Sequence, residues 1–231
     1  MTRVVHWLGG WASSLQCWEP ALKTSFPDWE HRFLDSHKFL SKTPKDAGLF
    51  NLPHGHAVVA WSMGSLLAHR WLTSTSDAWP IELPLLSLCP IFRFTGPGGI
   101  AEPVLARMKS KLETQRDAVL GDFWKRMPGT ENSDSAWRNA WRAGTRGYTT
   151  AELMEGLDFL QDMIVEPGTF PSMPRRWELW VGENDTLAPA GGWGNLLPKK
   201  VKVTHHPSGH LPFLECPHLI AEALERLSPQ A

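Results

Sequence analysis

Ser62 lies where an apolar segment gives way to a helical one, and a serine in that place can act as a nucleophile. Residues 57–61 are apolar throughout, and residues 65–71 have a helical pattern. In a turn between strand and helix the hydroxyl projects above the sheet, provided that the residues two before and two after the serine are small. Those residues are Ala60 and Gly64. A serine that only caps the helix is the alternative, but the flanking strand and helix favour the nucleophile.

A serine hydroxyl becomes an effective nucleophile when a histidine removes its proton and an acid orients that histidine. In this arrangement the acid and then the histidine follow the serine along the chain. Asp185 comes shortly after the apolar segment 177–181, and His210 lies in a loop before the last helix. The sequence therefore predicts Ser62, Asp185 and His210 as the catalytic triad of an ester hydrolase.

Alternatives to both partners lie close by in the sequence. Glu183 stands two residues before Asp185 and is a second candidate for the acid. His205 and His206 are alternatives to His210, but they lie in or at the end of a predicted strand, whereas His210 follows a glycine in a loop. Three residue types in the required order and context favour Asp185 and His210.

Acyl transfer also needs backbone N–H groups that point at the developing oxyanion. In this arrangement one N–H belongs to the residue after the serine, Met63, and the other to the loop after the first strand. That loop is 8–12, where Gly9 and Gly10 allow a tight turn, and Trp11 is predicted to supply the second N–H. A plain glycine turn is the alternative, and the serine turn favours an oxyanion hole.

The elements that would position these residues alternate between strand and helix. Apolar segments that predict strands are 4–7, 31–34, 56–61, 84–89, 177–181 and 201–205. Helices are expected over 14–24, 64–71 and 217–227, and the stretch 98–169 has only helical patterns. This alternation predicts an α/β fold with a mostly parallel central sheet flanked by helices. Residues 1–97 and 170–231 would form the core, with 98–169 inserted as a helical cap.

Composition and charge exclude several classes of protein. The chain has 231 residues and a formal net charge of −1, which suits one domain with an insertion and argues against nucleic-acid binding. It lacks the apolar segments of a signal peptide or a membrane span, so a cytoplasmic protein is expected. Three widely spaced cysteines and two short histidine clusters without further ligands predict no disulfide and no metal site.

These motifs resemble the α/β-hydrolase superfamily over nearly the whole chain, and more closely the pimeloyl-(acyl-carrier protein) methyl ester esterases of biotin synthesis. Residues 8–18 are similar to the oxyanion loop of that family, in which a tryptophan supplies the donor. Residues 61–64, Trp-Ser-Met-Gly, are similar to its Trp-Ser-Leu-Gly turn. Residues 179–189 and 208–217 resemble its acid and histidine loops, including a His-x-Pro-Phe sequence.

The resemblance implies a monomeric serine carboxylesterase without a cofactor. Such an enzyme removes the methyl group from a pimeloyl chain that an acyl-carrier protein holds. Two features depart from the family: Gly9-Gly10 replaces the usual His-Gly, and residues 35–39 lack its Pro-Gly-x-Gly-x-Ser turn. The same triad serves many esters and thioesters, so the substrate does not follow from the resemblance. A general carboxylesterase or thioesterase acting on diffusible substrates, and a non-catalytic binding protein, are the alternatives.

The predicted cap carries arginines and tryptophans at helical spacing. In a helix over 135–146, Arg138, Arg142 and Arg146 would form a stripe beside Trp137 and Trp141. Further basic residues of this segment are Lys109, Lys111, Arg116, Lys125 and Arg126. A solvated helix face is the alternative; the resemblance implies docking of an acidic carrier protein and its phosphate, which arginine recognises well. The predicted substrate-binding residues are Trp61, Trp137, Trp141, Arg138 and Arg142.

The chain contains 13 tryptophans, an unusual number for its length. The motifs place several of them beside the predicted site or on the cap, including Trp7, Trp11 and Trp61. We therefore expect several indoles to converge on one apolar cleft between sheet and cap. Packing or surface roles are expected for Trp29, Trp71, Trp79 and Trp193.

Overall fold

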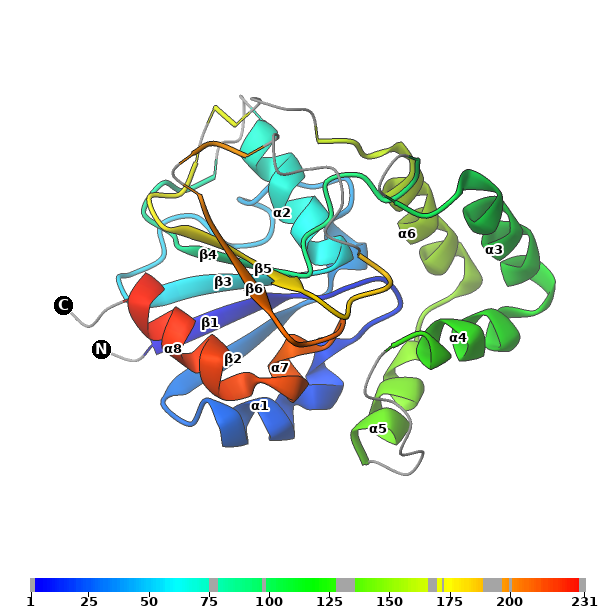
Figure 1. The fold of residues 1–231 in the computed structure, drawn as a ribbon, viewed down its shortest axis with the longest axis horizontal. Coiled ribbons are helices and arrows are strands. Elements are labelled where there is room, and N and C mark those ends of the chain that lie inside the picture. Colours follow the sequence, from blue (N-terminus) through cyan, green and yellow to red (C-terminus); the bar gives the residue numbers. More distant parts are fainter. Residues whose placement is uncertain are drawn as a thin grey trace.

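A six-stranded sheet forms the centre of the protein, and every pair of neighbouring strands is parallel (Figure 1). The structure is a computed structural model that describes residues 3–74, 79–96, 99–127, 136–165, 170–171, 173–188, 197–199 and 201–228. The strands are β1 (Arg3–Leu8), β2 (Trp29–Leu34), β3 (His56–Trp61), β4 (Leu85–Leu88), β5 (Trp177–Gly182) and β6 (Lys202–His206), in the order β2-β1-β3-β4-β5-β6. The predicted α/β class with a parallel sheet is confirmed.

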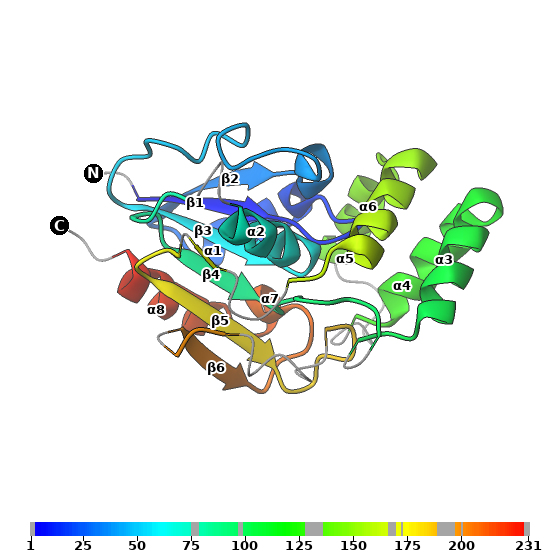
Figure 2. The same cartoon turned by 90° about the horizontal axis from the view of Figure 1, so that it is seen from above.

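Helices cover both faces of the sheet. Those beside it are α1 (Glu19–Ser25), α2 (Met63–Thr73), α7 (Pro212–Glu215) and α8 (Pro217–Leu227), with short 3₁₀ turns η1 (Leu15–Trp18) and η2 (Ser36–Phe39). Helix α2 lies on one face, and α1 and α8 lie on the other (Figure 2). Within the described ranges, no helix is both long enough and apolar enough to cross a membrane.

The burial of the central strands explains their composition. Strands β3 and β4 are buried at every position, and their sequences, His-Ala-Val-Val-Ala-Trp and Leu-Leu-Ser-Leu, are apolar on both faces. Their register pairs Leu8 with Ala60, Trp61 with Leu88, and Leu88 with Trp180. The carboxyl ends of these parallel strands therefore lie at the same end of the sheet, where the loops that follow them form the site.

The segment 14–24 differs from the predicted single helix. The structure has a 3₁₀ turn over Leu15–Trp18, and α1 begins only at Glu19. Pro20 explains the break, because in a continuous helix its ring would clash with the carbonyl of the residue four positions earlier. A proline is accommodated in the first turn of a helix, which is where α1 has it.

Beyond the carboxyl ends of the strands, the described residues form the helices of the cap, which are α3 (Glu102–Thr114), α4 (Arg116–Lys125), α5 (Ala136–Thr145) and α6 (Thr150–Asp162) (Figure 1). The chain enters and leaves this segment at neighbouring points, where Arg93 pairs with Ile164 and the Val165 N–H donates to the Phe92 carbonyl at 2.9 Å. Helix α5 contacts η1, and α6 contacts η2 and α2. The boundary of the cap at 98–169 stays a prediction.

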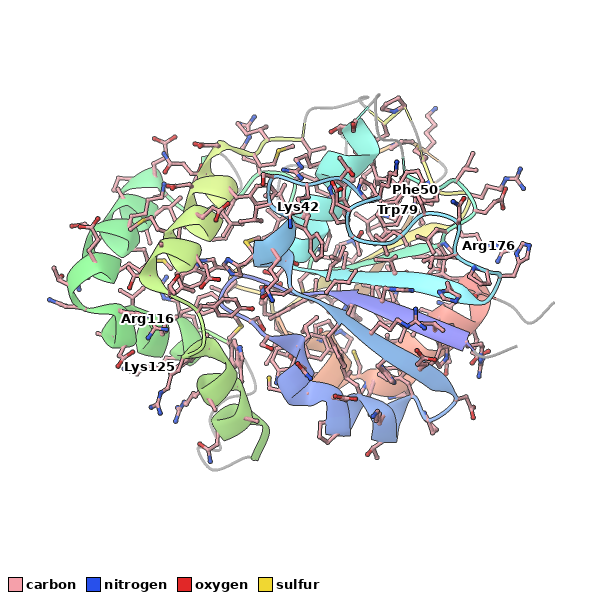
Figure 3. The ribbon with its side chains drawn as sticks, turned by 180° about the vertical axis from the view of Figure 1, so that it is seen from behind. Lys42, Phe50, Trp79, Arg116, Lys125 and Arg176 are labelled. Atoms are coloured by element: carbon pink, nitrogen blue, oxygen red, sulfur yellow. The ribbon has the colours of Figure 1, made fainter. Side chains whose placement is uncertain are left out.

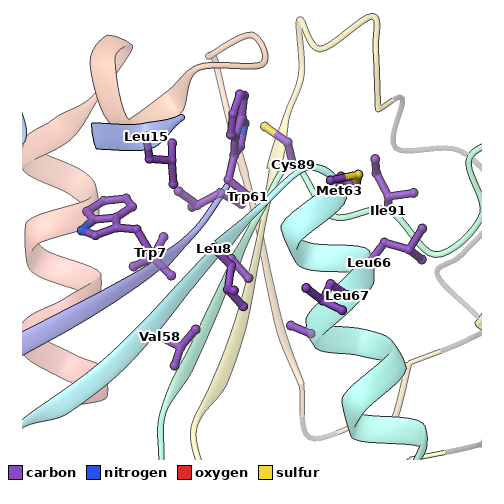
Figure 4. Close-up of a cluster of buried hydrophobic side chains, with 14 of the residues drawn as sticks. Trp7, Leu8, Leu15, Val58, Trp61, Met63, Leu66, Leu67, Cys89 and Ile91 are labelled. Carbon is purple, nitrogen blue, oxygen red and sulfur yellow. The ribbon is translucent and has the colours of Figure 1, made fainter. Parts of the chain in front are cut away.

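The hydrophobic core lies on both sides of the strands. Figure 4 shows Trp7 and Leu15 on one side, and Leu66 and Leu67 of α2 on the other. The outlying tryptophans Trp29, Trp71 and Trp79 are all buried in this core, and Trp193 lies outside the described residues.

Candidate active site

Ser62 occupies a strained turn between β3 and α2. Its backbone has φ 57° and ψ −122°, a conformation that a residue with a side chain rarely adopts. The turn is held from both sides: the Ser62 N–H donates to the Leu88 carbonyl at 3.1 Å, and the Ser62 carbonyl accepts the N–H of Ser65 at 2.9 Å. The strain places the Ser62 hydroxyl at the edge of the sheet where the loops meet.

Gly64 allows α2 to approach the loop after β1. A methyl group on Gly64 would collide with the carbonyl oxygens of Leu8 and Gly9, the second at 2.7 Å. Both obstacles are backbone atoms, so neither can rotate away. The small residue two positions after the serine is thus required by the packing of helix against loop.

Replacing Gly64 with alanine should lower the free energy of unfolding by about 1–3 kcal/mol, because the added methyl group overpacks a rigid contact. Gly121, in the middle of α4, is the matched control, since a methyl group there would meet no atom within 4 Å. Gly121→Ala should stabilise the protein by about 0.5–1 kcal/mol through helix propensity. Urea unfolding of both variants measures the difference; equal effects would contradict the packing argument.

The structure brings Ser62, His210 and Asp185 together in a hydrogen-bonded series. The Ser62 Oγ lies 3.0 Å from His210 Nε2, and His210 Nδ1 lies 2.8 Å from Asp185 Oδ2. The three residues follow β3, β6 and β5 respectively, and all are buried. The alternative acid Glu183 does not join this series: its N–H donates to the carbonyl of His206 at 2.9 Å, which joins the residue after β5 to the end of β6.

The second oxygen of Asp185 is also occupied. Its Oδ1 accepts the N–H groups of Leu187 and Ala188, each at 2.9 Å. Burial alone would raise the pKa of Asp185, but His210 and these N–H groups favour the carboxylate and lower the pKa from 3.8 to about 2. An ionised Asp185 accepts the Nδ1–H of His210, so His210 Nε2 is left to accept the Ser62 hydroxyl proton.

The predicted oxyanion loop lies next to Ser62. Met63 is the first residue of α2, so its N–H has no carbonyl partner within that helix. A methyl group on Gly10 would lie 3.1 Å from the Ser62 Cβ, which shows how closely the loop passes. Trp11 lines the same cavity as Ser62 and His210, and its indole Nε1 donates to the Leu153 carbonyl at 2.9 Å. The use of the Trp11 and Met63 N–H groups by substrate stays a prediction.

A cavity of about 470 Å³ opens in front of Ser62 and His210. This volume falls in the range of small-molecule sites. Its apolar walls come mainly from the cap: Val104, Met108, Val119, Phe123, Leu157 and Leu160. Its charged lining consists of Arg107, Lys111 and Arg126, with Asp122. The site is therefore an apolar chamber with a cationic border.

Helix α3 supplies much of this lining, of which only Lys111 is among the basic cap residues named from the sequence. Val104, Arg107, Met108 and Lys111 are three or four residues apart, so they share one helix face. This regular spacing was the feature of the sequence that could have identified the lining face of α3. Any amphipathic helix has the same spacing, so it does not by itself distinguish a cavity wall from a packed face.

Trp61 and Trp141 do not line the cavity, contrary to their predicted role in substrate binding. Both are 1% exposed and belong to an aromatic cluster behind the site. Trp18 lies at its centre, with ring centroids 5.4 Å from Trp61, 5.5 Å from Trp141 and 4.7 Å from Phe213. The Trp61 indole also donates to the His210 carbonyl at 2.7 Å. Trp11 lines the cavity, but Trp61 and Trp141 pack with Trp18 and support the His210 loop, so the predicted convergence on the cleft is wrong for these two indoles.

Arg142 and Arg146, the members of the predicted arginine stripe whose side chains the structure describes, do not line the cavity either. The Arg142 guanidinium lies 5.5 Å from the ring centre of Trp124 and does not line the chamber. Helix α5 packs against η1, so it lies beside the aromatic cluster and not over the serine. The side chains of Trp137 and Arg138 lie outside the described residues.

Other basic residues of the cap have structural partners. Lys109 forms an ion pair with Asp158. Arg116 donates to the carbonyls of Thr145 and Arg146, at the end of α5. Lys125 is exposed and lies 3.5 Å from Asp122. Figure 3 shows Arg116 and Lys125 on the cap, at the opposite end of the molecule from Arg176.

Cys89 lies beside the acid and the histidine, and the three could in principle hold a metal ion. The Cys89 thiol and ligand atoms of Asp185 and His210 lie within 4.8 Å of one another. Burial raises the pKa of Cys89 well above its ordinary value, so the thiol stays protonated, and a metal binds the thiolate. Asp185 and His210 are already hydrogen-bonded to each other. The donor chemistry therefore fits a proton-transfer series better than a metal centre.

Comparison with known proteins agrees with this architecture. A family model described as the alpha/beta hydrolase family matches residues 10–223. None of the curated proteins compared with the chain matches it.

Solved structures share the fold at low sequence identity. An esterase from Exiguobacterium antarcticum aligns with a TM-score of 0.77 at 14% identity, over 99% of this chain and 92% of its own. A thermophilic esterase from Thermogutta terrifontis aligns with a TM-score of 0.68 at 14% identity, over 97% and 88%. BioG from Haemophilus influenzae aligns with a TM-score of 0.58 at 16% identity, over 95% and 94%. At these identities the likeness shows the fold alone.

Proposed function

Because the chain belongs to the alpha/beta hydrolase family, we propose that it is a serine esterase with Ser62 as its nucleophile. The observation that carries this proposal is the continuous hydrogen-bonded series from Asp185 through His210 to Ser62, which opens on a cavity of substrate size. A fluorophosphonate probe, which reacts with activated serines, should label Ser62 in the native protein but not after denaturation. Absence of labelling would favour the alternative of a non-catalytic binding protein.

In the first half of the proposed reaction, Ser62 Oγ attacks the ester carbonyl while its proton passes to His210 Nε2. The carbonyl oxygen becomes an oxyanion, which the N–H groups of Met63 and Trp11 stabilise. The tetrahedral intermediate then expels the alcohol, which takes the proton from His210. Asp185 remains ionised throughout and stabilises the imidazolium.

In the second half, water attacks the acyl-serine. His210 removes a proton from the water and returns it to Ser62 Oγ when the acyl–oxygen bond breaks. The product is a carboxylic acid. The reaction requires no metal or organic cofactor.

We further propose that the ester is a methyl ester on a pimeloyl chain carried by an acyl-carrier protein. The motifs at residues 8–18 and 61–64 support this substrate, because they resemble esterases of that kind. The lining of the cavity also supports this substrate. The apolar cap residues suit an alkyl chain, and Arg107, Lys111 and Arg126 suit the phosphate or acidic surface of the carrier.

The decisive comparison is between the carrier-bound methyl ester and free methyl pimelate. The proposal expects a higher kcat/KM for the carrier-bound form, and expects wild type, but not Ser62→Ala, to rescue a biotin-requiring strain that lacks its own esterase. Equal activity on both esters would favour a general carboxylesterase. The apolar cap walls are compatible with that alternative, since they would also accept a small diffusible ester.

Neutralising the cationic border should separate anionic from neutral substrates. Arg107→Gln combined with Lys111→Gln should raise KM for the carrier-bound ester about 10-fold, since each lost charge–phosphate contact weakens binding. The same variant should hydrolyse p-nitrophenyl butyrate as wild type does. Lys125→Gln is the control, because this exposed cap residue does not line the cavity. An equal loss on both substrates would contradict the assignment.

A further inference from the structure

His37 connects the proposed oxyanion loop to the cap. It lies in η2, is buried, and has one ring nitrogen on each of two backbone groups. His37 Nε2 accepts the N–H of Ala12 at 3.2 Å, and His37 Nδ1 lies 3.0 Å from the Glu152 carbonyl of α6. Ala12 directly follows Trp11, so His37 holds the residue next to the proposed oxyanion donor.

The chemistry of these two partners specifies one form of the ring. A carbonyl only accepts, so His37 Nδ1 must carry a proton to bond with Glu152. A backbone N–H only donates, so His37 Nε2 must have a free lone pair for Ala12. The neutral ring with its proton on Nδ1 satisfies both partners. Protonation of Nε2 would place a second donor opposite the Ala12 N–H, with no acceptor between them, and so break the hydrogen bond to Ala12.

The backbone of Ala12 needs support from outside the loop. Its φ of 51° lies in the left-handed region, which a non-glycine residue adopts only when its surroundings enforce it. The hydrogen bond to His37 fixes the plane of the peptide that joins Trp11 to Ala12. That plane in turn restricts the rotation of Trp11 and the direction of its N–H.

Helix α6 packs closely on the same two residues. A methyl group on Gly156 would lie 2.6 Å from His37 Cε1 and 2.7 Å from Trp11 Cδ1. The Trp11 indole also donates to the Leu153 carbonyl at 2.9 Å. The cap therefore contacts the oxyanion loop at Trp11 directly, and at Ala12 through His37.

We propose that His37 is a positioning residue that aligns the Trp11 N–H with the oxyanion and makes this alignment depend on the docking of α6. The inference rests on the proposed esterase function. His37 itself does not touch substrate, since it acts through Ala12. We call the two hydrogen bonds of His37, to Ala12 and to Glu152, the His37 bridge. Loss of this bridge should lower kcat and leave KM nearly unchanged, because oxyanion contacts form in the transition state.

Several charged groups face His37 and set its protonation. Asp35 and Lys38 lie in or beside η2, and Glu152 and Glu155 come from α6. The Tyr148 ring packs on His37 at 4.6 Å, and its hydroxyl donates to Asp35 at 3.0 Å. Burial lowers the pKa of His37 from 6.5 and outweighs the carboxylates, which raise it. The bridge is therefore intact at neutral pH and is lost as the pH falls through this lowered pKa.

Two substitutions test the bridge, and a second histidine provides the control. His37→Leu removes both hydrogen bonds, whereas His37→Gln can accept from Ala12 and donate to Glu152. His31 is matched to His37, because His31 Nδ1 accepts the Trp7 indole N–H at 3.0 Å and its other nitrogen lies 3.3 Å from the Phe26 carbonyl. His31→Leu thus loses a similar pair of bonds away from the loop.

We expect His37→Leu to lower kcat for p-nitrophenyl acetate roughly 10- to 100-fold, less than the loss of a whole oxyanion donor. His37→Gln should recover to within roughly 3-fold of wild type, and His31→Leu should keep its kcat despite a lower melting temperature. As the pH falls through the lowered pKa of His37, kcat of wild type should fall relative to that of His37→Gln and approach that of His37→Leu. Equal kcat losses in both leucine variants, or the same pH profile in wild type and His37→Gln, would overturn the positioning role.

Two measurements test whether the His37 bridge exists in solution, independently of enzyme activity. Imidazole NMR of His37 should show the neutral ring protonated on Nδ1, and the Ala12 amide should exchange with solvent faster in His37→Leu than in wild type. A ring protonated on Nε2, or unchanged exchange, would overturn the bridge even in an active enzyme. A bridged but inactive wild type would instead reject the proposed esterase, and the positioning role with it.

Discussion

Ser62→Ala should lower kcat for p-nitrophenyl acetate hydrolysis by about 10⁴- to 10⁶-fold, since the remaining residues have no group to form the acyl intermediate. The reaction left over would come from water attacking a substrate still bound near the oxyanion hole. Steady-state kinetics with active-site titration measure the loss. Titration is needed because trace contamination by a host esterase would set the lower limit of detection.

Ser87→Ala is the control for the loss of a buried hydroxyl. The Ser87 Oγ lies 3.1 Å from His69 Nε2 and accepts the Trp177 indole N–H at 3.1 Å, in the middle of β4. This variant should lose stability but keep kcat within about 2-fold. Ser62→Ala should instead lose kcat and keep its stability, with an unchanged circular dichroism spectrum. Full activity in Ser62→Ala would reject Ser62 as the nucleophile.

Asp185→Asn should produce the second largest loss, about 10⁴-fold in kcat. The asparagine amide donates where the carboxylate accepted, so His210 Nδ1 would have to accept. The proton of the neutral ring would then sit on Nε2, facing the Ser62 hydroxyl that it must deprotonate. Glu183→Gln, a change in the same loop outside the hydrogen-bonded series, should retain wild-type activity. Comparable losses in both variants would contradict the assignment of the acid.

The same substitution should change the acid dependence of stability. Folding lowers the pKa of Asp185 from 3.8 to about 2, so its charge contributes stability above pH 3.8, and this contribution is lost as the pH falls toward 2. Asp185→Asn lacks that contribution. Melting temperatures of the two proteins should therefore converge as the pH is lowered through this window, and a constant difference would contradict the argument.

The hydrogen-bonded series could be predicted because each of its members is marked by its neighbours in the sequence. Ser62 lies between an apolar strand and a helix with small residues on either side, and Asp185 and His210 follow strands in a required order. Parallel strands bring their carboxyl ends to one edge, so order along the chain was enough to predict proximity. The central strands were equally clear, because burial on both faces leaves few polar residues in them.

The lining of the site could not be predicted in the same way. Whether a cap residue faces substrate or the core depends on how four helices pack, and no local pattern records that packing. Trp141 and Arg142 were the conspicuous residues, but α5 packs on η1 and turns them toward other aromatic rings. The less conspicuous face of α3 lines the chamber instead.

His37 was missed for a related reason. Its partners Ala12 and Glu152 are 25 and 115 residues away in the chain. Moreover, both partners offer only backbone atoms, so their side chains give no sign of the interaction. A histidine in a short polar segment without a ligand pattern looks like any other surface histidine until the fold brings α6 onto it.

The use of backbone atoms at this junction has an evolutionary consequence. Helix α6 reaches the oxyanion loop through the main-chain carbonyls of Glu152 and Leu153, which a residue of any type would supply. The two ends of the cap also meet at one backbone hydrogen bond, between Phe92 and Val165. Cap sequences can therefore diverge without altering the backbone groups that hold the loop, except at Gly156, where a methyl group would collide with Trp11 and His37. Selection for new substrates can act on one part of the gene while the chemistry is inherited unchanged.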